Sequence, residues 1–141
     1  MLNLEYLRNL NDQQKEAVSC LNGPLLIVAG AGSGKTKVLT SRIAHIIKLK
    51  KAFPNQIIAV TFTNKAAKEM QNRVSKILKK EAVGLSWLGT FHSISAKLLR
   101  KHAPAVGLRS NFSIVDQDDQ VRLIKNICKA ENIDIKKISP K

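Results

Sequence analysis

The octapeptide AGAGSGKT, residues 29–36, decides the fold class of this 141-residue chain. It follows an apolar run, residues 25–29, which is too short for a helix and is typical of a buried strand. From Lys35 onward, apolar side chains recur at helical spacing. A glycine-rich turn between a strand and a helix presents converging backbone N–H groups and a helix N-terminus, and both attract phosphate. The stretch therefore predicts a P-loop and a nucleoside triphosphate ligand.

Two side chains of this loop have predictable roles. The Lys35 ammonium should reach the β- and γ-phosphates, and the Thr36 hydroxyl should bind Mg²⁺. Ala29 stands where the usual GxxxxGK[ST] pattern has its first glycine, and alanine is small enough there if its φ stays negative. The alternative interpretation is a glycine-rich turn that carries a lysine by chance.

Outward from the loop, the hydrophobic pattern predicts helices alternating with short strands, with Asn11 capping the first helix. This order is typical of an α/β protein with a parallel sheet and right-handed crossovers. The expected helices cover residues 11–21, 66–80 and 116–131, one begins near Lys35, and one holds Ile94, Leu98 and Leu99. The last helix should bury Val121, Ile124, Ile127 and Cys128. The expected strands cover residues 25–29, 57–62 and 85–90, with a short fourth at 112–115.

The composition points to a polyanionic partner. Twenty-four Lys and Arg against ten Asp and Glu give a formal net charge of +14, and binding to phosphates releases condensed counterions. Solvated helix faces, or acids located elsewhere in a larger protein, are the alternatives.

No apolar run approaches the roughly 20 residues of a membrane span. The N-terminus is no secretory signal, and Cys20 and Cys128 form no CxxC pair, so a reduced cytoplasmic protein is expected. The three histidines show no metal-ligand spacing.

Two further segments follow predicted strands, at the sheet edge where open α/β proteins bind ligands. TFTNKAA covers residues 61–67, and GTFHS covers residues 89–93. Each joins an aromatic ring to hydroxyl, amide or cationic groups, which suits base stacking combined with phosphate contacts. The alternatives are structural: Thr63 or Asn64 capping a helix, Phe62 and Phe91 in the core, and His92 in an ordinary loop.

Together with LNDQQKEAV at residues 10–18, these segments resemble superfamily 1 DNA helicases of the UvrD/Rep/PcrA type, over essentially the whole chain. In that family the four segments are the Q motif and motifs I, Ia and Ib, in this order. NFSIVD at residues 111–116 also looks like the family. The resemblance implies a P-loop NTPase of RecA-like fold, a parallel sheet flanked by helices. Residues 1–141 would be the N-terminal portion of its ATP-binding domain, incomplete at the C-terminus, with about 132–141 entering an inserted subdomain.

The resemblance also implies site residues. Gln14 would read the adenine edge, although its spacing from Asn11 also fits a capping box. Lysine at position 37 replaces a frequent arginine and loses the guanidinium fork. The expected catalytic pair is Lys35 and Thr36, with Mg²⁺ on Thr36. The expected nucleotide contacts are Gln14, Ala29, Gly30, Ala31, Gly32, Ser33, Gly34, Lys35, Thr36 and Lys37. The expected DNA contacts are Phe62, Thr63, Asn64, Thr90 and His92.

Hydrolysis in such helicases also needs an acidic pair on a later strand and arginines from a second motor domain. The sequence shows no Asp-Glu pair after an apolar strand. Residues 112–116 imitate a strand ending in a metal-binding carboxylate, but Asp116 or Asp119 more simply complements the dipole of the last helix.

Three functions remain open at this point. The first is an ATP- and Mg²⁺-dependent helicase or translocase, moving 3′ to 5′ by resemblance, on single-stranded DNA or a single-strand/duplex junction. It would be cytoplasmic and associated with the nucleoid when working, and hydrolysis would need more than this chain. The second is a small P-loop kinase or ATPase with Asp116 as metal ligand. The third is a module that only binds nucleotide or DNA. These patterns do not identify protein partners, and they do not distinguish a role in repair from one in replication or recombination.

Overall fold

The computed structural model describes residues 4–133. The chain divides into two compact units, Met1–Leu98 and Leu99–Lys141. The expected entry of residues 132–141 into an inserted subdomain falls almost entirely outside the described residues.

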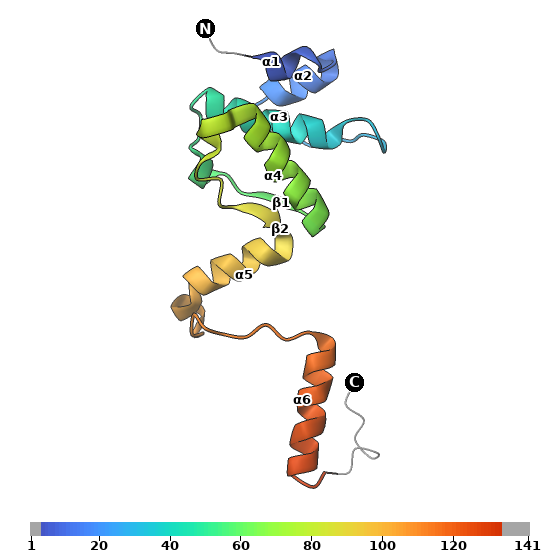
Figure 1. Cartoon of the computed structure of the whole chain (residues 1–141), viewed down its shortest axis with the longest axis vertical. Coiled ribbons are helices and arrows are strands. Elements are labelled where there is room, and N and C mark those ends of the chain that lie inside the picture. The colour runs from blue at the N-terminus through green and yellow to red at the C-terminus, as the bar shows by residue number, and fades with distance from the viewer. Residues whose placement is uncertain (1–3, 134–141) are drawn as a thin grey trace. The chain divides into compact units, whose positions relative to one another are not determined.

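The first unit contains most of the secondary structure (Figure 1). Its helices begin at polar caps, because a side-chain oxygen there accepts from an N–H that the helix leaves unpaired. Asn11 caps α2 and Thr63 caps α4, as the sequence suggests. The elements are α1 (Glu5–Arg8), α2 (Asp12–Ser19), α3 (Lys35–Lys48), a 3-10 turn η1 (Pro54–Gln56), β1 (Ala59–Thr61), α4 (Asn64–Leu78), a 3-10 turn η2 (Lys79–Ala82) and β2 (Leu88–Thr90).

The two strands are parallel, as predicted, with Ala59 opposite Leu88 and Thr61 opposite Thr90. Helix α4 connects them and packs against α3 as well as against both strands. A parallel pair needs such a crossover because its strands run in the same direction. The carboxyl ends of β1 and β2 therefore lie side by side, and each is followed immediately by one of the aromatic motifs.

The core of this unit lies between α3, α4 and the strands. Met70 and Val74 of α4 are fully buried there, and their spacing of four residues places them on one helix face. The cluster consists of Ile43, Ala44, Ile47, Ala59, Met70, Val74, Leu78 and Leu88. A smaller cluster of Leu10, Val18 and Val38 fixes α2 against α3.

The second unit continues from α5 (Phe91–Lys101), which crosses the boundary between the units. It then contains a 3-10 turn η3 (Ala103–Val106) and α6 (Gln117–Ala130). Asp116 caps α6 by accepting from the Asp119 N–H at 2.8 Å, so the predicted start of the last helix is confirmed. The predicted burial on α6 is mostly wrong, since Cys128 is buried but Ile124 and Ile127 are about half exposed.

Two predicted strands do not form. Residues 25–29 precede the P-loop without strand hydrogen bonds, and Leu26 and Val28 are 87% and 86% exposed. A strand requires a hydrogen-bonded neighbour, and β1 pairs only with β2 in the part of the chain that the structure describes. Residues 112–115 are likewise irregular. An apolar run indicates that a segment favours strand conformation. Whether a partner strand lies beside it to form the hydrogen bonds depends on the fold.

The two strands that do form are shorter than predicted. Ile57 and Leu85 lie in turns instead, where their N–H groups donate to the carbonyls of Pro54 and Ala82. Because these N–H groups donate within turns, they are not available for hydrogen bonds that would extend the pairing of the two strands. Helix α2 similarly ends at Ser19 rather than at residue 21.

Candidate nucleotide-binding and DNA-contacting site

The glycine-rich loop at residues 29–36, the predicted P-loop, turns into α3 through glycines that the backbone requires. Gly32 and Gly34 have φ of 77° and 86°, a left-handed conformation that side chains with a Cβ disfavour. Gly34 is the N-cap residue of α3, and Lys35 is its first residue. The predicted order of loop and helix is thus present, although the preceding segment is extended chain rather than a paired strand.

The Lys35 ammonium lies within the loop. It donates to the carbonyls of Ala29 and Gly30 at 2.7 Å and 2.6 Å. The Ser33 hydroxyl closes the same turn by donating to the Gly30 carbonyl at 2.7 Å. Thr36 is exposed in the first turn of α3. A cation and a helix N-terminus therefore meet at the mouth of the loop, which is the arrangement that attracts phosphate.

Gln14 links α2 to this loop. Its Oε1 accepts from the Asn11 N–H at 3.1 Å, and the Asn11 side chain accepts from the Gln14 N–H at 2.8 Å. The capping box suggested by the sequence is therefore present. The Gln14 Nε2 also donates to the Ser33 carbonyl at 3.0 Å, so the side chain holds the P-loop as well as its own helix. The expected adenine contact remains a prediction.

Lys37 has a tethering role that sequence reasoning missed. Its ammonium donates to the carbonyl of Asn9, between α1 and α2. Arg42, further along α3, donates to the Ala17 carbonyl at 2.7 Å. These two bonds join α3 to the segment that carries Gln14. No local pattern could reveal them, because the partners lie 28 and 25 residues away.

The motif after β1 presents an unsupported aromatic ring. Phe62 is 94% exposed, so the core alternative for this residue is wrong. Thr63 caps α4 by accepting from the Ala66 N–H at 3.2 Å, which confirms the structural alternative for that hydroxyl. Asn64 begins α4 and is exposed. A large apolar ring in water next to polar groups can serve as a stacking surface.

The motif after β2 combines a buried threonine with two exposed rings. Thr90 is buried, and its hydroxyl accepts from the Ser93 N–H at 3.2 Å. The hydroxyl thus has a structural partner, and the expected DNA contact of Thr90 stays a prediction. His92 is exposed, and its ring meets that of Phe91 edge-on at 6.3 Å between centroids. Phe91 itself is 65% exposed, so it is not a core residue.

Because Thr61 and Thr90 are register partners, the exposed rings of Phe62 and Phe91 follow neighbouring strand ends. The sheet therefore brings the two motifs to one edge, as the sequence predicts. Asp116, the candidate metal ligand, belongs to the second unit and uses one carboxylate oxygen as the cap of α6. Among residues 4–133 no group of three or more His, Cys, Asp or Glu side chains could hold a metal ion.

Comparison with known proteins decides the family. Residues 10–141 match the UvrD/REP helicase N-terminal domain. The chain belongs to this family. It is 50% identical over 135 residues to the ATP-dependent DNA helicase PcrA of Staphylococcus epidermidis, and 49% identical over the same length to that of Staphylococcus aureus. Each match covers 96% of this chain but only 18% of the relative.

One further contact in this UvrD/REP helicase N-terminal domain was not predicted. The Gln71 amide of α4 donates to the Leu88 carbonyl of β2 at 2.8 Å. It directly follows the buried Met70 and is itself exposed, so no local pattern in the sequence singles it out. The bond connects the helix after Phe62 to the strand before Phe91. No helix within residues 4–133 is long and apolar enough to cross a membrane.

Proposed function

We propose that this chain is the nucleotide-binding and single-strand-contacting part of a RecA-like motor domain in an ATP-dependent DNA helicase. The observation that carries the proposal is the shared sheet edge, where exposed Phe62 and Phe91 follow two parallel strands. Membership of the helicase family and the P-loop support it. The relatives named PcrA are described as ATP-dependent DNA helicases, and the proposal extends that activity to the protein to which this chain contributes.

In the nucleotide site, Lys35 would exchange its two loop carbonyls for phosphate oxygens. The loop N–H groups and the start of α3 would neutralise the remaining phosphate charge. Mg²⁺ would sit at the exposed Thr36 hydroxyl, because hydroxyl oxygen is a ligand that this hard cation accepts. A shift of the loop on nucleotide binding would be transmitted to α2 through Gln14, because its Nε2 already donates to the Ser33 carbonyl.

Turnover would need carboxylates and arginines that other parts of the protein supply. The nearest candidate, Asp116, serves as a helix cap, and no observation favours the alternative of a self-sufficient kinase or ATPase. We therefore expect the residues present to bind ATP without hydrolysing it. Translocation from 3′ to 5′ and preference for a junction follow from the family resemblance alone.

The nucleotide assignment is tested by titrating a fluorescent ATP analogue with Mg²⁺ into the chain. Lys35→Met should weaken binding by at least about tenfold, because a charge-assisted phosphate contact is lost. Lys68→Met is the matched control, since Lys68 is an exposed lysine on α4, and it should leave affinity unchanged. Equal affinity of the Lys35 variant and the unaltered chain would contradict the proposed site. Steady-state hydrolysis that Lys35→Met abolishes would instead favour the self-sufficient enzyme.

The DNA assignment is tested with a fluorescent single-stranded oligonucleotide. Phe62→Ala should cost about 1–3 kcal/mol of binding free energy, the usual contribution of one stacked base. Phe53→Ala is the control, because Phe53 is 70% exposed but precedes β1 and so lies toward the other sheet edge. Similar losses in both variants would show that the aromatic rings act non-specifically.

A further inference from the structure

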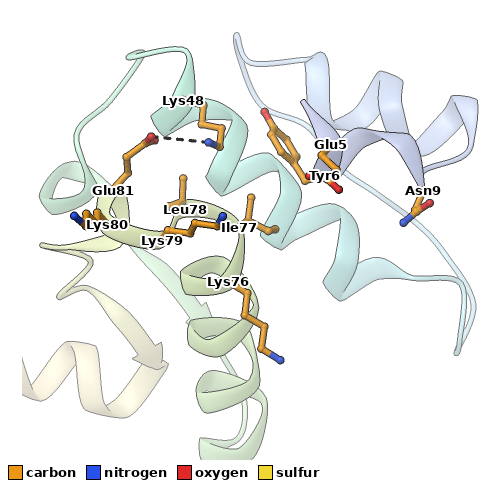
Figure 2. A pocket seen from close by; sticks show the side chains of 10 residues that line it. All are labelled: Glu5, Tyr6, Asn9, Lys48, Lys76, Ile77, Leu78, Lys79, Lys80 and Glu81. Atoms are coloured by element: carbon orange, nitrogen blue, oxygen red, sulfur yellow. Dashed lines mark ion pairs between the residues drawn. The ribbon is translucent and has the colours of Figure 1, made fainter. Parts of the chain in front are cut away.

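A hollow of about 730 Å³ lies at the end of α4 that is remote from the TFTNKAA motif after β1 (Figure 2). It is lined by α1, the last turn of α3, and the junction of α4 with η2. Helix α4 begins beside Phe62 and ends at the hollow, and its 15 residues span roughly 22 Å. The hollow is therefore separate from the proposed DNA-contacting edge.

Its charge is predominantly positive. Lys48, Lys76, Lys79 and Lys80 line it, against the carboxylates of Glu5 and Glu81. Lys48 is the most enclosed cation, with a side chain only 15% exposed, and it forms a loose ion pair with Glu81 at 3.9 Å. Figure 2 marks this pair with a dashed line. A long pair of this kind leaves the ammonium able to bind a second anion.

The hollow also has apolar surface. Ile77 and Leu78 contribute from α4, and Tyr6 contributes its ring from α1. The Tyr6 hydroxyl forms a hydrogen bond of 2.8 Å with Nδ1 of His45, which fixes the position of the ring. Burial, followed by the nearby Glu81 charge, raises the pKa of Tyr6, so the hydroxyl keeps its proton for this bond.

The backbone at Lys79 is strained. This residue ends α4 with φ of 53° and ψ of −118°, a conformation that glycine tolerates and lysine does not favour. Helix-dipole complementarity accounts for lysines in the last turns of α3 and α4. It does not account for a lysine, rather than a glycine, at this strained position beside the hollow.

We infer that this hollow is a docking site for an acidic peptide segment of a partner protein, one that carries an apolar anchor residue between carboxylates. The carboxylates would pair with Lys48 and Lys79, and the anchor would pack on Tyr6 and Ile77. A nucleic-acid backbone fits less well. It offers no apolar anchor, and its evenly spaced phosphates would meet the carboxylates of Glu5 and Glu81. The inference does not depend on the proposed nucleotide or DNA sites.

The test uses a blocked, fluorescent peptide EEDLFEED, its uncharged twin QQNLFQQN, and a single-stranded oligonucleotide, at about 150 mM salt to screen long-range attraction. Binding is measured by anisotropy, and amide shifts in the NMR spectrum locate it. We expect the acidic peptide alone to shift α1 and η2 amides. K79G should weaken it, and K48M/K79G should weaken it by at least about tenfold.

The control variant K125A/K129A removes the same charge from exposed positions of α6 and should change peptide affinity less than about twofold. Equal losses in both double variants would mean attraction to the overall charge and would overturn the inference. So would oligonucleotide shifts at α1 and η2 that K79G removes, because they would identify a nucleic-acid site. The NMR spectrum of K79G without peptide shows whether the variant is folded, so a loss of binding is judged on folded protein.

Discussion

His45 is a buried histidine whose protonation should control stability. Burial lowers its pKa, and its Nδ1 forms a hydrogen bond of 2.8 Å with the Tyr6 hydroxyl. Because the unfolded chain binds the proton more readily, the free energy of unfolding should fall as pH drops below about 6.5, the ordinary histidine value. The contribution of this one group cannot exceed about 1.4 kcal/mol per pH unit. Urea denaturation at several pH values measures it.

H45Q should remove this part of the pH dependence, since glutamine does not titrate. H92Q is the matched control, because His92 is exposed, and it should leave the slope of the unaltered chain in place. A slope that survives in H45Q would locate the proton uptake elsewhere.

Lys79 is a second residue whose replacement has a predictable sign. K79G should raise the free energy of unfolding by about 1 kcal/mol, because glycine adopts its backbone conformation without strain. K76G should lower it by about the same amount, since Lys76 lies in the last turn inside α4. Both variants lose the same side chain, so opposite shifts in the urea midpoint would isolate the backbone effect. Destabilisation by K79G would show that its side-chain contacts outweigh the strain.

At the scale of elements, the bond from Gln71 to the Leu88 carbonyl joins α4 to β2. Q71A would leave that carbonyl of a buried strand residue without its donor, at a cost of about 1–3 kcal/mol. N72A, at the exposed neighbouring position, should change stability by less than about 0.5 kcal/mol. Thermal or urea unfolding of the two variants compares them directly. Equal stability of Q71A and N72A would mean that water replaces the amide.

The elements also show which features a sequence can specify. Asn11, Thr63 and Asp116 were predictable caps because a cap depends on residues three positions away. The register of β1 with β2, by contrast, joins residues 29 positions apart. The failed strand at residues 25–29 has the right side chains, but strand formation requires hydrogen bonds from a neighbour that no local pattern specifies.

The candidate site divides in the same way. The glycine-rich turn into α3 was predictable because its glycines, Lys35 and the start of α3 are contiguous. Phe62 was predictable as an aromatic next to a strand end, but its exposure depends on the whole sheet. The burial of Thr90 and the tether from Lys37 to Asn9 depend on how distant segments pack. The sequence thus identifies which side chains have suitable chemistry, and the fold determines which of them are exposed to a ligand.

At the scale of the whole molecule, the net charge of +14 should make DNA affinity strongly dependent on salt. Each phosphate contact to a single strand adds about 0.7 to the slope of log affinity against log salt. K65A, which removes an exposed cation beside Phe62, should therefore reduce both affinity and slope. F62A should reduce affinity and leave the slope unchanged, because stacking releases no counterions. Titrations at several salt concentrations separate the two effects. A reduced slope in F62A would mean that the ring only positions cations along the backbone and does not stack on a base.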